Sequence, residues 1–161
     1  MSHGGASFIN QLKLFKMSTP AEMIRKLEAY NLVGEVVEIL NADKKILEQA
    51  NAEQWRKGKR ASGAPIGKYK SGKYAFMKNQ MNPEAGAGQV DLILTKKTVN
   101  SITTDITTDS IVFKLNSDEW NLKQRYGENI LGLNKESKTK FIKEKLLPDL
   151  LKSFSAKTGA K

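Results

Sequence analysis

The stretch from Gln89 to Leu133 constrains the fold most, because it holds the clear strand signals of the chain. Residues 102–107 place Ile102, Thr104 and Ile106 on one face, and residues 111–115 place apolar side chains at every second position. The residues between them, 108–110, are Thr-Asp-Ser and have turn chemistry, so the pattern predicts a β-hairpin. Residues 89–95 also alternate. A meander of three or more antiparallel strands is the simplest sheet that these runs can form.

Helical periodicity precedes this stretch. Thr19, Pro20 and Glu22 have the spacing of a capping box with proline at the first helical position, which predicts a helix start. Residues 33–56 keep apolar side chains on one face and alternating charges on the other, which predicts one long helix. A short helix with one apolar stripe is also expected over residues 7–17.

A last amphipathic helix is predicted after Asn134, a plausible cap. Pro148 lies inside its apolar stripe and is expected to kink or restart it. Just before the cap, Gly132 allows a close backbone approach. Leu131 and Leu133, on either side of that glycine, are therefore predicted to be core residues and not ligand contacts.

The predicted fold class is α+β, with N-terminal helices, a small antiparallel β-meander, a C-terminal amphipathic helix and a long basic loop or arm. At 161 residues the chain is long enough for a substantial core, and one domain over residues 1–161 is the simplest organisation. Residues 1–6 are expected to be a flexible tail, residues 57–88 an extended loop, and residues 155–161 a polar tail.

Positive charge is concentrated in the loop at residues 57–88, here called the basic loop. The formal net charge is +10, and no acidic residue occurs between Glu53 and Glu84. Aromatic rings alternate with lysines there, a pattern in which rings can stack on bases while lysines hold phosphates. Docking on an acidic protein surface and a solvated loop whose tyrosines anchor it to the domain are the alternatives. The segment has few large apolar groups for its length, so we expect it to be mobile in the isolated subunit. The candidate interaction residues are Arg56, Lys57, Lys59, Arg60, Lys68, Tyr69, Lys70, Lys73, Tyr74 and Lys78.

Several functional classes are disfavoured by composition. The chain has no cysteine, so it has no disulfide, thiolate zinc site or cysteine nucleophile. Its single histidine, His3, is far in sequence from every serine that could need a base. Gly63 to Tyr69 is one residue too short for a phosphate-binding loop, and a tyrosine stands where serine or threonine would hold magnesium. We therefore predict no enzyme activity, no catalytic residues, no cofactor and no metal site. No apolar run approaches the length of a transmembrane helix, and no secretory signal is evident.

Two short motifs resemble a known family. Leu94-Thr95 through Ser101-Ile102 resembles the motif LxxTGxLxxSI, and Ile130-Leu131-Gly132-Leu133-Asn134 resembles FLGLS. Both motifs mark virion morphogenesis and tail-completion proteins of tailed bacteriophages, and proteins from phages of Bacteroidetes share the phrase YGENILGL. Lys96 replaces the glycine of the first motif, and Arg125-Tyr126-Gly127 replaces the usual proline-arginine approach to the second.

The resemblance implies a structural protein of the virion, assembled in the cytoplasm of the bacterial host. It would form a homo-oligomeric ring at the head–tail junction, of neck or tail-completion type, and contact the portal or connector on one side and the tail tube on the other. Nonspecific contact with DNA would be compatible with this place, and no membrane is involved. The alternative that remains open is a stand-alone nucleic-acid-binding protein that uses the basic aromatic residues 56–78.

Overall fold

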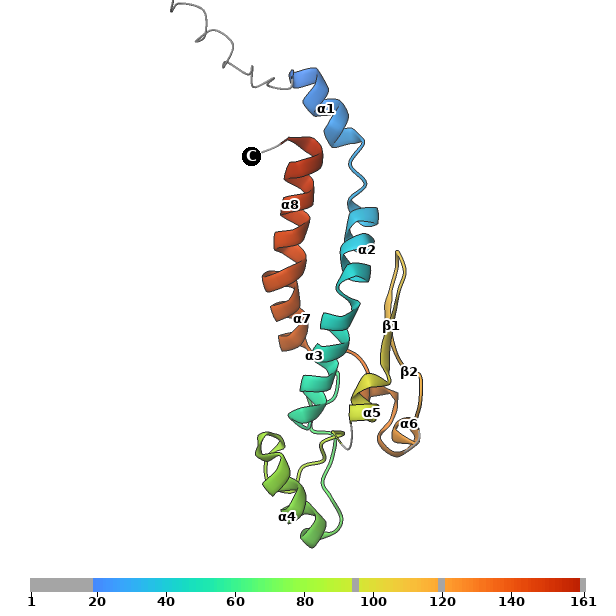
Figure 1. Ribbon diagram of the computed structural model, residues 1–161, viewed down its shortest axis with the longest axis vertical. Helices are drawn as coiled ribbons and strands as arrows, with labels where there is room; N and C mark the ends of the chain where they lie inside the picture. The colour runs from blue at the N-terminus through green and yellow to red at the C-terminus, as the bar shows by residue number, and fades with distance from the viewer. Residues whose placement is uncertain (1–18, 94–95, 119–120, 160–161) are drawn as a thin grey trace, which may run out of the picture. The chain divides into compact units, whose positions relative to one another are not determined.

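The computed structural model describes residues 19–93, 96–118 and 121–159 (Figure 1). These residues form two compact units, residues 19–30 with 153–159 and residues 31–152. The helix expected over residues 7–17 and the flexible tail at residues 1–6 lie outside the described residues. The α+β class is confirmed, because the described residues form helices and one small antiparallel sheet.

The N-terminal helices begin where local signals predict them. In α1 (Pro20–Glu28) the capping box is complete: the Thr19 hydroxyl accepts from the Glu22 amide at 3.2 Å, and the Glu22 carboxylate accepts from the Thr19 amide at 2.9 Å. The single helix predicted over residues 33–56 is wrong. It is divided into α2 (Leu32–Ala42) and α3 (Lys44–Arg56) by Asp43, whose backbone leaves the helical region at φ −98°, ψ 13°. Aspartate is unfavourable in helix interiors because its side chain bonds to nearby backbone groups in non-helical conformations. It favours caps and junctions, which explains the break.

The predicted hairpin is confirmed. Strands β1 (Ile102–Ile106) and β2 (Ile111–Leu115) are antiparallel, with Ile102 opposite Leu115 and Ile106 opposite Ile111. The turn is closed by Thr107, whose hydroxyl accepts from the Ser110 amide at 3.1 Å. A short helix, α5 (Lys96–Asn100), leads into β1.

The predicted third strand is wrong for the described part of residues 89–95. Val90 donates its amide to the Gly67 carbonyl at 2.9 Å, and Tyr69 donates to the Gly88 carbonyl at 3.0 Å. The Asp91 amide donates to the Tyr69 hydroxyl at 3.3 Å. Because these backbone groups bond to the basic loop, they are not available to pair with β1. Residues 94 and 95 lie outside the described residues.

The C-terminal part contains α6 (Leu122–Tyr126), η3 (Glu128–Ile130), α7 (Lys135–Phe141), a π-helical turn η4 (Ile142–Leu146) and α8 (Leu147–Thr158). Asn134 caps α7 as predicted, accepting from the Ser137 amide at 2.8 Å. The disturbance expected at Pro148 takes the form of the π-turn directly before it, in which the Leu147 amide bonds to the Ile142 carbonyl. The polar tail predicted over residues 155–161 begins within a helix, because α8 continues to Thr158.

The core of residues 31–152 lies around α3, which contacts β1 on one side and α7 on the other (Figure 1). One buried cluster surrounds Trp55 and includes Val90, Ile102 and Ile130. A second joins Leu40, Leu47, Leu133 and Phe141. No helix within the described ranges is long and apolar enough to span a bilayer.

Candidate functional site

The basic loop is a packed element, which corrects the expectation of an extended arm with little to hold it. It contains α4 (Gly72–Met81) and the 3-10 turn η2 (Pro83–Ala85). Ile66 is only 2% exposed and belongs to the core cluster around Trp55. Its amide bonds to the Gly58 carbonyl at 2.8 Å, closing the base of the loop. One buried isoleucine therefore anchors a segment that looks mainly polar in sequence.

Arg60, predicted as an interaction cation, holds the fold together instead. Its guanidinium donates to the Ile66 carbonyl at 2.6 Å, to the Tyr126 carbonyl at 3.0 Å and to the Asn129 side-chain oxygen at 2.9 Å. These bonds join the basic loop to the chain between α6 and η3. Because its donors are used within the protein, Arg60 is not placed to receive a ligand.

Lys78 is likewise not an exposed cation. It is 6% exposed, and its ammonium lies 2.6 Å from the carboxylate of Asp91, which is 2% exposed. The ammonium also donates to the Ile93 carbonyl at 3.1 Å, and the Asn82 amide donates to the other carboxylate oxygen at 2.7 Å. Burying a charged side chain is costly unless an opposite charge and hydrogen bonds compensate for its lost hydration. Lys78 therefore fixes α4 to residues 91–93, and its prediction as an interaction residue is wrong.

Tyr69 and Tyr74 pack against each other, with ring centroids 4.9 Å apart and planes at 87°. The Tyr69 hydroxyl donates to the Asp91 carboxylate at 3.0 Å. Burial, and then the negative charge of Asp91, raise the pKa of this hydroxyl well above its usual value, so it stays neutral. The two rings brace the loop and do not form an open stacking platform.

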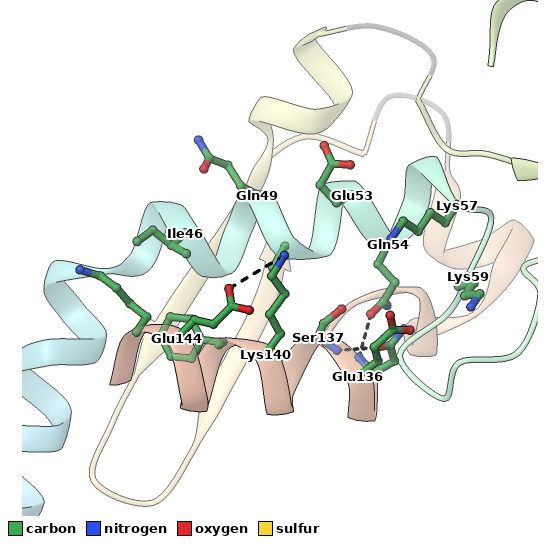
Figure 2. Close-up of a pocket in the computed structure, with 14 residues that line it drawn as sticks. Ile46, Gln49, Glu53, Gln54, Lys57, Lys59, Glu136, Ser137, Lys140 and Glu144 are labelled. Carbon is green, nitrogen blue, oxygen red and sulfur yellow. Dashed lines mark hydrogen bonds and ion pairs between the residues drawn. The ribbon is translucent and has the colours of Figure 1, made fainter. Parts of the chain in front are cut away.

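The three cations at the start of the predicted set lie among carboxylates. Arg56 pairs with Glu53 at 3.5 Å. Lys57 and Lys59 line a groove of about 540 Å³ between α3 and α7, shown in Figure 2. The same groove is lined by Glu53, Glu136, Lys140 and Glu144, so its charges are of both signs. It does not concentrate positive potential.

Lys68 and Lys70 have different surroundings. They line a cleft of about 390 Å³ with Arg125 of α6, and this cleft also includes Tyr69, Val90 and Tyr126. We call it the cation cleft. No carboxylate belongs to its lining. Lys73 is exposed on α4 and is not part of the lining. Arg125 was not among the sequence candidates, because it lies 55 residues beyond Lys70 and only the folded chain brings the two together.

The segment that carries the second family motif is held by α3. The Asn51 side chain accepts from the Gly132 amide at 3.1 Å, and the Gln54 side chain accepts from the Asn134 amide at 2.7 Å and donates to the Gly132 carbonyl at 3.0 Å. The Trp55 indole donates to the Ile130 carbonyl at 2.7 Å. We call Asn51 and Gln54 the amide clamp.

The prediction for the two motif leucines is confirmed for Leu133, which is buried, while Leu131 is partly buried against the core. Gly132 has φ 106°, and a Cβ there would lie 3.4 Å from the Ala61 Cβ, so the close approach is real. The motif is therefore a structural element of the core in this chain.

Within the described residues, no three histidine or acidic side chains come together as a metal site would require. No protein-family model, no curated protein and no solved structure matches the chain. Its function is therefore inferred from the geometry above and from the motif resemblance.

Proposed function

We propose that this protein is a structural component of a tailed-phage virion at the head–tail junction, of neck or tail-completion type. In this role it forms a homo-oligomeric ring between the portal or connector and the tail. The observation that carries the proposal, beside the motif resemblance, is a pair of separate exposed apolar surfaces on residues 31–152.

The first, the hairpin surface, consists of Leu32 and Val33 on α2 with Ile111 on β2. These side chains are between 41% and 53% exposed. They border a groove of about 400 Å³ lined by α2 and the hairpin turn. The described sheet has only two strands, so its outer edges carry backbone groups without a strand partner. Apolar surface beside an open strand edge is typical of an interface.

The second, the helix surface, consists of Ile142, Leu147 and Leu151, which are between 47% and 57% exposed. Leu147 and Leu151 are four residues apart and share one face of α8. In Figure 1 the hairpin lies on one side of α3 and the helix formed by α7 and the start of α8 on the other, so β2 and α8, which carry parts of the two surfaces, belong to different flanks of the same unit.

Two unlike surfaces on different flanks suit a head-to-tail contact, in which one surface of a subunit meets the other surface of the next. Repeated around an axis, such contacts close into a ring. This is the assembly that the motif resemblance implies. The alternative function, that of a stand-alone nucleic-acid-binding protein, does not explain either apolar surface.

The proposal is tested most directly on particles. Peptides of this chain should be found in density-purified virions, in a copy number per particle that fits a ring and not a capsid. The gene should lie beside genes for a portal, a terminase and tail proteins. Purified particles without the chain, or a locus with no virion gene, would contradict the proposal.

A further inference from the structure

We propose that the cation cleft binds the phosphate groups of a nucleic-acid backbone, without reading its sequence. The cleft brings together Lys68 and Lys70 of the basic loop with Arg125 of α6, and its lining contains no carboxylate. All three side chains are exposed and can reach a ligand. This inference does not depend on the virion role, because it concerns a different surface from the two apolar ones.

The charges of this cleft are not compensated. Several other cations of the described chain have acidic partners, including Lys123, which lies near Arg125 on α6 and pairs with Glu128 at 3.4 Å. None of Lys68, Lys70 and Arg125 makes an ion pair within the described residues. Three like charges around a concave surface concentrate positive potential there and attract a polyanion.

The fold holds these cations in place before a ligand arrives. Tyr69 lies between the two lysines, and its hydroxyl is fixed by Asp91. Arg60 bonds to the Tyr126 carbonyl at 3.0 Å and so joins the end of α6 to the basic loop. The negative charge of Asp91 is neutralised by Lys78. A preorganised arrangement lowers the entropy cost of binding.

The geometry favours phosphodiesters over an acidic peptide. A duplex presents one negative charge per about 1.7 Å of its axis, so several phosphates meet a cluster of cations at once. Arginine can hold a phosphate through two parallel hydrogen bonds. Tyr69 is packed against Tyr74, so these two rings offer little to the bases. The expected contact is with the backbone alone.

The test is fluorescence anisotropy of the full chain with labelled duplex and single-stranded DNA, between about 50 and 200 mM salt, the range over which phosphate contacts show clearly. The variant K68Q/K70Q/R125Q is compared with K135Q/K143Q/K152Q, which removes the same charge from exposed lysines outside the cleft. The cleft variant should lose at least about tenfold in affinity at low salt. Its slope of log affinity against log salt should fall by about 2 to 3, one for each lost phosphate contact. The control should change by less than about threefold.

Four further measurements complete the design. Urea unfolding of both triple variants should match the parent, and R125K should keep most of the affinity because it keeps the charge. Two duplexes of unrelated sequence should bind within about twofold of each other. Polyglutamate at equal charge should compete poorly. Equal losses in the cleft variant and the control, a strong sequence preference, efficient competition by polyglutamate, or no DNA binding by the parent would each overturn the proposal.

Discussion

The residues that most define this fold are polar side chains buried in its core. Asn51 and Gln54 lie on α3 among apolar neighbours and bond to the backbone of the motif segment. From the sequence, α3 shows only an apolar stripe with Leu47 on it. The sequence alone does not distinguish a buried amide side chain from an exposed one, because the hydrogen-bond partner of the buried one is distant along the chain. The core leucine Leu133 was predictable because a neighbouring glycine marked the close approach, whereas the amide clamp was not.

The amide clamp should contribute measurably to stability. Gln54→Met keeps the side-chain length but leaves the buried Asn134 amide and the Gly132 carbonyl without partners. We expect the free energy of unfolding to fall by about 1–3 kcal/mol for each group left unsatisfied. Urea denaturation is the measurement. Gln49→Met, on the exposed side of the same helix, should have little effect. Equal effects of the two substitutions would contradict the clamp.

Leu133→Ala tests the second core cluster. Leu133 is 5% exposed and packs with Leu40, Leu47 and Phe141. The lost contacts and the cavity should lower the free energy of unfolding by about 2–5 kcal/mol. Leu151→Ala, on the exposed helix surface, should change it far less. A thermal or urea melt that shows no difference between these variants would mean that Leu133 is not core.

Asp91→Asn tests the buried ion pair. The amide keeps the shape of the carboxylate but leaves the Lys78 ammonium buried without a counter-charge. Removing one partner of a buried pair costs about 3–5 kcal/mol. The matched change Asp105→Asn breaks the exposed pair with Lys114, and its denaturation midpoint should move much less. If D91N is no less stable than D105N, the pair contributes nothing to the fold.

At the scale of elements, local signals were sufficient wherever an element depends on its own residues. The hairpin, the capping box at Thr19 and the cap at Asn134 all follow from a few neighbouring side chains. The missing third strand, the split at Asp43 and the packed basic loop depend on distant partners. Residues 90 and 91 alternate like a strand, yet the basic loop takes their hydrogen bonds. Alternation predicts an extended chain but not the neighbour with which it pairs.

Ile66→Ala should release the basic loop. Ile66 is the buried anchor of that segment, so its truncation should lower the free energy of unfolding by about 2–5 kcal/mol. Brief trypsin digestion should then cut faster at the exposed lysines Lys68, Lys70 and Lys73. Phe76→Ala, at an exposed position on α4, is the control and should leave both the stability and the cleavage rate near those of the parent. Rapid cleavage of the parent itself across residues 57–78 would show that the loop is not packed.

At the scale of the whole molecule, the sequence located the positive charge but not its uses. Within one basic run, Arg60 and Lys78 became structural, Lys57 and Lys59 lie beside carboxylates, and Lys68 and Lys70 remain uncompensated. A run of basic residues in the sequence shows only that a segment contains many cations. The packing of the folded chain decides which of them face solvent. The two apolar surfaces could not be recognised from the sequence for a related reason. Leu32 and Val33 fall within a helical stripe that leads to the core residue Leu40, and Leu147 falls within a stripe that begins at the core residue Phe141.

The two apolar surfaces can be tested against each other. Val33→Thr with Ile111→Thr disables the hairpin surface, and Leu147→Gln with Leu151→Gln disables the helix surface. At concentrations where the parent assembles, each variant alone should stay monomeric in light scattering. An equal mixture should form dimers and stop there, because only one intact pair of surfaces can meet.

Phe76→Ser, outside both surfaces, should assemble like the parent. Two outcomes would contradict head-to-tail pairing. In the first, the mixture stays monomeric although each variant is folded. In the second, the parent itself remains monomeric at every accessible concentration.

The π-helical turn at Ile142–Leu146 has a consequence for the divergence of such chains. A π-turn is an α-helix that has gained one residue, and each residue turns the helix by about 100°. A relative lacking one residue between 142 and 146 would form an unbroken α-helix there, because the wider π-turn already absorbs the rotation that the extra residue would add. Leu147 and Leu151 would then keep their present face. A single-codon deletion at this point would therefore leave both the core and the helix surface in place, and a one-residue gap in an alignment would be its only trace.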